Sequence, residues 1–367
     1  MKTTSLPMTF TFLDQNLKIN STLEIMSNKN DSYLRAIPVG HVGMSCFTMI
    51  FGTISNLTAL GILAKSRVRF RRQSKAPFLF LTVALLLADL GGHVILGAFV
   101  LYLYTIGTEP TPNFCKIFGT SMVFFGLCPL LLGCAMAVER YIAITKPFFH
   151  MSMITVAHVK MALLFLSSVA LVLAVLPLFS VGTYTTQIPK TWCFLNLQGE
   201  GSADRILALT FSGLGLTALT LSLFCNILSG LALLHARTKY NDSTKNPTTR
   251  CGRRASSASS SSMNCSLDVE MMAQLAAITV VSCVCWGPFL IHIPMVQLHG
   301  ASGNLKPGLI LLFLRMASWN QILDPWVYIL LRRAVLLSVC CRGQTPASTV
   351  SECSSYRDYR RRDSNLQ

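Results

Sequence analysis

The chain has 367 residues, of which 52% are hydrophobic and 13% charged, and it carries a formal net charge of +16. Soluble domains have about 25% charged residues, so this composition excludes an ordinary soluble globular protein. The basic residues stand in short clusters between apolar runs, which argues against a nucleic-acid-binding surface and for a membrane protein.

The N-terminal segment, 1–38, contains no unbroken apolar run, so we expect no cleavable signal peptide there. A helix that spans a bilayer needs about 20 mostly apolar residues. Such stretches predict helices over 39–64, 77–104, 115–140, 158–181, 205–234, 271–298 and 308–331. The expected fold class is therefore an all-α membrane protein, a seven-transmembrane helix bundle. The third and seventh helices carry the most polar residues, which favours positions around a polar cavity.

The distribution of basic residues predicts how the bundle is oriented. The first loop carries Lys65, Arg67, Arg69, Arg71, Arg72 and Lys75, the fifth carries Arg237, Lys239, Lys245, Arg250, Arg253 and Arg254, and the second, 105–114, has neither Lys nor Arg. By the positive-inside rule the first, third and fifth loops are cytoplasmic, so we expect the N-terminus outside and the C-terminus inside. Glycosylation sequons at Asn20 and Asn30 lie in the expected extracellular segment.

These boundaries predict an extracellular segment at 1–38, a transmembrane domain at 39–331, and a cytoplasmic juxtamembrane helix and disordered tail at 332–367. A Ser-rich cytoplasmic loop, 241–266, lacks hydrophobic periodicity and is expected to be disordered. Cys340 and Cys341 follow two arginines and are candidates for palmitoylation, with unmodified thiols as the alternative. The 13 cysteines show no metal-ligand spacing, and we expect no cofactor.

Polar side chains inside a bilayer are costly and call for a partner or a function. Asp89 lies midway along the second helix and Asn56 lies in the first. Asn320, Asp324 and Tyr328 are spaced four residues apart and share one face of the seventh. These groups predict a buried network, in which Asp89 and Asp324 either help to hold a sodium ion or waters, or simply join the helices.

Two motifs stand at opposite ends of the third helix. Cys115 begins the helix, and Cys193 lies in the loop at 182–204. Because we place these two cysteines outside the membrane, we expect a disulfide between them. Glu139-Arg140-Tyr141 ends the helix on the cytoplasmic side. An ion pair between the glutamate and the arginine would hold back the arginine, which on release would meet a partner helix.

Prolines predict a kink in each of the last two helices. Trp286-Gly-Pro288 lies in the sixth helix, and Asp324-Pro325 lies in the seventh. Proline removes a backbone hydrogen bond and bends a helix. We expect Trp286 to sense a ligand beside a hinge at Pro288, although an aromatic residue near a kink is often only a packing residue.

The order of these motifs resembles that of rhodopsin-like G-protein-coupled receptors. The fourth and fifth helices lack the usual tryptophan and proline of that family, an absence typical of its prostanoid receptor branch. Residues 122–133, Thr191-Trp-Cys-Phe194 and 315–332 are similar to prostanoid receptor sequences in long blocks. Within the branch, Gly92-His-Val-Ile95 and the Ser-rich loop look most like subtype 1 of the prostaglandin E2 receptors, with the prostaglandin F receptors as the nearest competitors.

Arg315 is the residue that points to an acidic lipid ligand. It lies nine residues before Asp324, about 13 Å further out along the seventh helix, among apolar neighbours. A guanidinium suits a carboxylate, although an arginine here would equally snorkel to the headgroups. The two residues are about 180° apart on an ideal wheel, so both face the interior only if the side chain wraps inward or the helix is irregular.

The resemblance implies a prostaglandin, E2 ahead of F2α, bound through Arg315, Thr191 and Tyr104. We expect Met122, Trp192 and Ser318, which lie in the similar blocks, to line the same site. The implied partners are a heterotrimeric G protein, favouring the Gq type with phospholipase C and calcium, and possible kinases and arrestin. The implied location is the plasma membrane.

Other classes of protein fit the sequence less well. A transporter would also carry Asp89, Asp324 and Arg315 in its helices, but it predicts repeated halves that the sequence lacks. An enzyme would need a nucleophile and base or metal ligands at matched spacing, and His93 and His292 show none. We therefore do not expect an enzyme.

Overall fold

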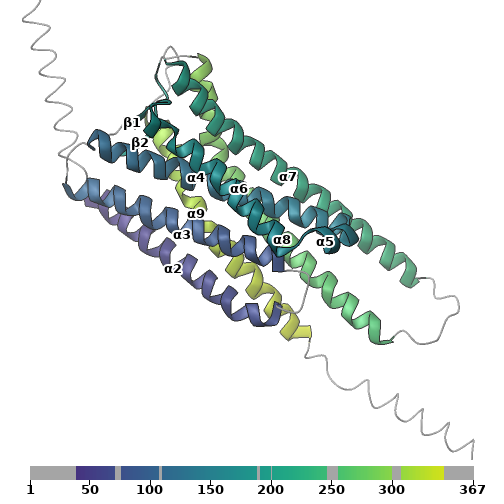
Figure 1. The fold of residues 1–367 in the computed structure, drawn as a ribbon. Helices are drawn as coiled ribbons and strands as arrows, with labels where there is room; N and C mark the ends of the chain where they lie inside the picture. Colours follow the sequence, from purple (N-terminus) through teal and green to yellow (C-terminus); the bar gives the residue numbers. More distant parts are fainter. Residues whose placement is uncertain are drawn as a thin grey trace, which may run out of the picture.

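A computed structural model describes the backbone of residues 39–70, 76–106, 110–187, 191–199, 201–245, 255–299 and 307–342. Within these ranges seven long helices run side by side as a bundle (Figure 1). They are α2 (Val39–Phe70), α3 (Ala76–Ile106), α4 (Pro112–Thr145), α6 (Val156–Val175), α7 (Ser202–Lys245), α8 (Ala255–His299) and α9 (Pro307–Arg342). Each contains most of one predicted span, so the seven-helix fold class is confirmed.

Local sequence explains where several helices begin and end. Thr111 caps α4 by accepting a hydrogen bond from the Phe114 N–H at 3.3 Å, and Pro112 occupies the first helical turn. Pro147 begins the short helix α5 (Pro147–Met153) directly after α4. The α-helical part of the fourth span ends at Val175, and the span continues to Phe179 as the 3₁₀ helix η1 (Leu176–Phe179) around Pro177.

Six of the helices in the described part of the chain are long and apolar enough to cross a membrane. The seventh, α9, is not among them. It carries Arg315, Asn320, Gln321 and Asp324 within its apolar run, which lowers its mean hydropathy. Three of these four side chains are buried, so α9 faces neighbouring helices with its polar side, as its composition predicts.

An antiparallel hairpin follows η1, in a region where the sequence predicted only a loop. Strand β1 (Tyr184–Gln187) pairs with β2 (Trp192–Leu195) in the register Tyr184 to Leu195 and Gln187 to Trp192. Every residue of β2 is buried. A strand of four residues is too short to be stable alone, so its packing against the bundle must hold it.

Helices reach into the segment 241–266 from both sides, and the disorder expected there stays a prediction. Helix α7 continues to Lys245, and α8 begins at Ala255 within the serines. Once a long helix is nucleated, each added residue costs little, which lets α8 extend through residues of modest helix propensity. Helix α9 runs from Pro307 to Arg342, past the expected end of the seventh span at 331, and the separate juxtamembrane helix stays a prediction.

Helix α4 lies at the centre of the bundle. It contacts α3, α6, α7 and α8 as well as both strands of the hairpin, which Cys115 joins to its first turns. More of α4 is buried than of any other spanning helix described. The motifs at its two ends are therefore surrounded by protein rather than lipid.

Candidate functional site

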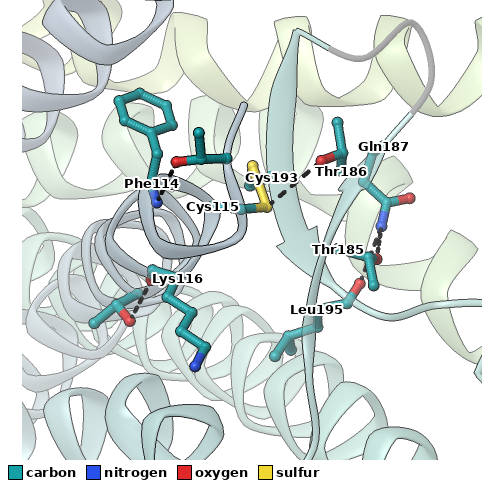
Figure 2. The surroundings of a disulfide bond; sticks show 10 residues. Phe114, Cys115, Lys116, Thr185, Thr186, Gln187, Cys193 and Leu195 are labelled. Carbon is teal, nitrogen blue, oxygen red and sulfur yellow. Dashed lines mark hydrogen bonds between the residues drawn. A yellow bond between two sulfur atoms is a disulfide. The ribbon is translucent and has the colours of Figure 1, made fainter. Parts of the chain in front are cut away.

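A disulfide attaches the hairpin to the first turns of α4. Cys193 of β2 is bonded to Cys115, with their Cα atoms 5.3 Å apart, which confirms the predicted pair. Figure 2 shows the bond between strand and helix, with the Thr186 hydroxyl of β1 near the Cys115 sulfur. The hairpin is thus covalently held at one end of the bundle.

Tyr184 of β1 provides a second attachment, which the sequence analysis missed. Its hydroxyl donates to the carbonyl of Ala174 in the last turn of α6 at 2.6 Å. Its ring lies against Gly119 of α4, where a Cβ would come within 2.3 Å of the ring. Burial raises the pKa of Tyr184, so the hydroxyl keeps its proton and remains a donor.

The residues predicted to bind the ligand belong to elements that meet at the hairpin end of the bundle (Figure 1). They are Tyr104 near the end of α3, Met122 in the first third of α4, Thr191 and Trp192 at the start of β2, and Arg315 and Ser318 in the first third of α9. Tyr104, Met122 and Thr191 are half-buried, Trp192 is buried, and Arg315 and Ser318 are exposed.

Arg315 and Asp324 lie on different sides of α9, as the helical wheel requires. Asp324 is buried with Asn320 and Gln321, whereas Arg315 is exposed on the side that also carries Leu312. The Ser318 hydroxyl donates to the Arg315 carbonyl at 2.7 Å, within the helix. Arg315 is therefore an exposed residue of α9 and lies outside the buried polar network.

That network occupies the middle of the bundle. Asn56 of α2 donates to the Gln321 carbonyl of α9 at 3.0 Å, and Asn320 donates to Asp324 at the same distance. Tyr328 is buried one turn below Asp324. The predicted contact between the first and seventh helices is thus present.

Several buried oxygen atoms at this level have no hydrogen-bond partner among the described residues. They are Asn56 Oδ1, both carboxylate oxygens of Asp89, Asn320 Oδ1 and Asp324 Oδ1. A buried oxygen without a partner is costly, so this set is suited to waters or a hard cation, which takes oxygen ligands. The sodium site expected at Asp89 and Asp324 stays a prediction.

At the other end of α4 the predicted ion pair is formed, and a histidine joins it. Arg140 donates to Glu139 through Nε at 2.5 Å and through Nη2 at 2.6 Å. His150 Nε2 of α5 lies 2.7 Å from Glu139 Oε1. All three side chains are buried. The sequence contained no signal for His150, because only the fold of α5 returns it to Glu139.

Two neighbouring helices also contact Arg140. Its guanidinium carbon lies 4.9 Å from the centroid of the Phe78 ring of α3, and its Nη1 lies 3.9 Å from the Met271 sulfur of α8. Tyr141 is half-buried beside it. Arg140 therefore bridges α3 and α8 while Glu139 holds it.

Trp286 of α8 is part of a chain of aromatic rings that reaches the hairpin. Its ring centroid is 6.1 Å from that of Phe289, and Phe289 is 5.4 Å from Phe194 of β2. Phe194 is also 5.3 Å from Phe211 of α7. Phe194 lies in one of the blocks that are similar to prostanoid receptor sequences, but nothing in the sequence marks it for a role.

Helix α8 contains a second proline, Pro294, besides the predicted Pro288. Proline lacks the N–H that would bond the carbonyl four residues earlier, here that of Leu290. Ser212 of α7 donates to this carbonyl at 2.6 Å. Further out, Gln297 Nε2 donates to the Leu197 carbonyl, just after β2, at 2.7 Å. The outer part of α8 is thus tied to α7 and to the hairpin connection.

Some predicted modification sites lie outside the described structure. Asn20 and Asn30 precede the first described residue, and the side chains of Cys340 and Cys341 are not described. Glycosylation and palmitoylation therefore stay predictions.

The chain is similar to known receptors over most of its length. Residues 56–328 match the family model described as 7 transmembrane receptor (rhodopsin family). The prostaglandin E2 receptor EP1 subtype of Mus musculus is 45% identical over 335 residues, covering 82% of each chain. The Homo sapiens prostaglandin F2-alpha receptor is 42% identical over 329 residues, covering 86% of this chain and 87% of the receptor.

A solved structure supports the fold independently. Squid rhodopsin superposes with a TM-score of 0.68 at 15% identity, covering 81% of this chain and 77% of that one. The ion pair, the disulfide and the seven-helix bundle agree with the sequence similarity. This chain therefore belongs to the rhodopsin family of seven-transmembrane receptors, in its prostaglandin receptor branch.

Proposed function

We propose that the chain is a plasma-membrane receptor for prostaglandin E2 that binds the ligand's carboxylate through Arg315. The observation that carries this proposal is the 45–46% identity to prostaglandin E2 receptors of the EP1 subtype over about four-fifths of the chain. The runner-up is prostaglandin F2α, since receptors for it are 42% identical.

The chemistry of the hairpin end supports an anionic lipid. Arg315 is an exposed arginine of α9, and a planar guanidinium can bind a carboxylate in two places. Tyr104 and Thr191 add hydroxyl donors, both half-buried. Met122 is half-buried and supplies apolar surface for a hydrocarbon tail, whereas the buried Trp192 would contact the tail only if it were uncovered.

The proposed mechanism is a shift between two receptor states. Prostaglandin binds the active state more tightly, and the population moves by that difference in affinity and no more. In the inactive state Glu139 and His150 hold Arg140 against α8. Outward movement of α8 about Pro288 removes Met271 and lets Arg140 meet the G protein, for which we propose the Gq type.

The direct test is a calcium response in cells that lack prostanoid receptors. We expect prostaglandin E2 to act at lower concentrations than F2α, and Arg315→Ala to lose potency by about 10- to 150-fold. This range corresponds to one hydrogen-bonded charged contact. Arg205→Ala is the matched control, because Arg205 is an exposed arginine at the start of α7, also near the hairpin end.

Each outcome separates one part of the proposal from the rest. A preference for F2α reassigns the ligand but leaves the anchor in place. Equal potency of the two arginine variants rules out Arg315 as the carboxylate partner. Binding of labelled E2 without a calcium signal refutes the Gq assignment, and no binding of either prostaglandin to surface-expressed receptor refutes the ligand class.

A further inference from the structure

Phe194 of the hairpin contacts α8 directly through Phe289, and this one ring separates it from Trp286. Side chains alternate along a strand, so Cys193 points to α4 while Phe194 points to the opposite side. There its ring meets Phe289 at 5.4 Å with the planes at 66°. Phe289 in turn meets Trp286 at 6.1 Å and 71°. Edge-to-face pairs of this kind fix relative orientation as well as distance.

The chain of rings is closely packed at every step. Phe194, Phe289 and Trp286 are 2%, 1% and 7% exposed. Protein interiors of this density rearrange between discrete packings rather than deform smoothly. A shift of Phe194 therefore requires Phe289 to move, and Phe289 lies against Trp286.

The two elements that carry this row of rings, the hairpin and α8, are each attached to a neighbouring part of the bundle. The hairpin is held by the Cys115 disulfide and by the hydrogen bond of Tyr184. The outer part of α8 is tied to the segment after β2 by Gln297. Pro288 lies between Trp286 and Phe289 in the sequence, where it removes one backbone hydrogen bond from α8.

We propose that Phe194 is a positioning residue that couples the hairpin to Trp286 through Phe289, so that the hairpin and α8 share two joint arrangements. This proposal rests on the proposed function for the ligand, which would act from beneath the hairpin. It assigns the hairpin a part in activation, in addition to covering the site. Phe211, which also touches Phe194 but lies on α7, is outside the coupling path.

The first test separates affinity from activation in purified receptor in lipid nanodiscs. The coupling factor is the ratio of prostaglandin E2 affinities measured with and without G protein. We expect Phe194→Leu and Phe289→Leu each to lower this factor by about two- to tenfold, the range of one aromatic pair. The double variant should lose no more than the larger single loss, because both variants break one path. Phe211→Leu, equally buried, should leave the factor unchanged.

A second test needs no ligand. In a receptor where Trp286 is the remaining tryptophan, mild reduction of the Cys115–Cys193 bond frees the hairpin and should shift Trp286 emission. Phe194→Leu should abolish the shift, and Phe211→Leu should keep it. If Phe194→Leu does not fold, Phe289→Leu tests the same contact from the α8 side.

The outcomes distinguish the coupling from the ligand assignment. A reduction-induced shift that depends on Phe194, in a receptor that binds no prostaglandin, overturns the proposed function and supports the coupling. No shift in the parent receptor, an equal effect of the Phe211 and Phe194 variants, or additive losses in the double variant would overturn the coupling.

Discussion

The hydrogen bond from Ser212 to the Leu290 carbonyl should matter only because of Pro294. In the wild type this carbonyl has no N–H partner four residues later, and Ser212 supplies the missing donor at 2.6 Å. Ser212→Ala leaves it without that donor at a site where Ser212 is 1% exposed. Hydrogen bonds between membrane helices contribute about 0.6 kcal/mol on average and up to about 1.7 kcal/mol. We expect Ser212→Ala to destabilise the receptor by an amount in that range.

Pro294→Ala provides the decisive comparison. Alanine restores an N–H that can bond Leu290 within α8, so the Ser212→Ala cost should fall close to zero in that background. The expected interaction free energy between the two variants is therefore about as large as the single cost of Ser212→Ala.

Unfolding can be followed without a ligand through buried thiols. Cys128, Cys225 and Cys285 are buried and free, so a thiol-reactive dye labels them as the receptor unfolds in detergent. The folded fractions of the wild type, the two single variants and the double variant at one temperature give the interaction free energy between Ser212 and Pro294. An unchanged Ser212→Ala cost in the Pro294→Ala background would refute the reasoning, because the serine would then act independently of the proline.

Three further substitutions test contacts seen in the structure. Gly119→Ala should weaken the attachment of the hairpin, because its Cβ would overlap the Tyr184 ring, and should lower the free energy of unfolding by about 1–3 kcal/mol. Thermal unfolding measures this loss, and a neutral result would show that the ring moves freely. His150→Ala should raise ligand-independent signalling, because Glu139 loses its contact with α5. His150→Gln keeps a hydrogen-bond donor and should have the low basal activity of the wild type. Equal basal activity in all three proteins would show that the contact between His150 and Glu139 does not hold the receptor inactive. Asp204→Ala should speed prostaglandin dissociation, because Asp204 accepts hydrogen bonds from the backbone and side chain of Thr183 just before β1. An unchanged dissociation rate would show that the ligand does not depend on this attachment of the hairpin to α7.

The sequence alone determined the seven helices, because each needs one long apolar run and each run is visible without a partner. It also determined the Cys115–Cys193 bond and the Glu139–Arg140 pair, since compartment and adjacency limit the choices. Composition did not show where the helices on either side of the Ser-rich segment end, since α8 begins at Ala255 among the serines.

Tertiary structure decided which distant residues complete these motifs. His150 reaches Glu139 because α5 folds back after Pro147. Ser212 of α7 reaches the Leu290 carbonyl of the neighbouring helix α8. Phe194 joins Phe289 because a short hairpin exists only when the bundle buries it. Periodicity describes one element at a time, whereas these contacts depend on which faces of separate elements pack together, and that is fixed only when the whole bundle forms.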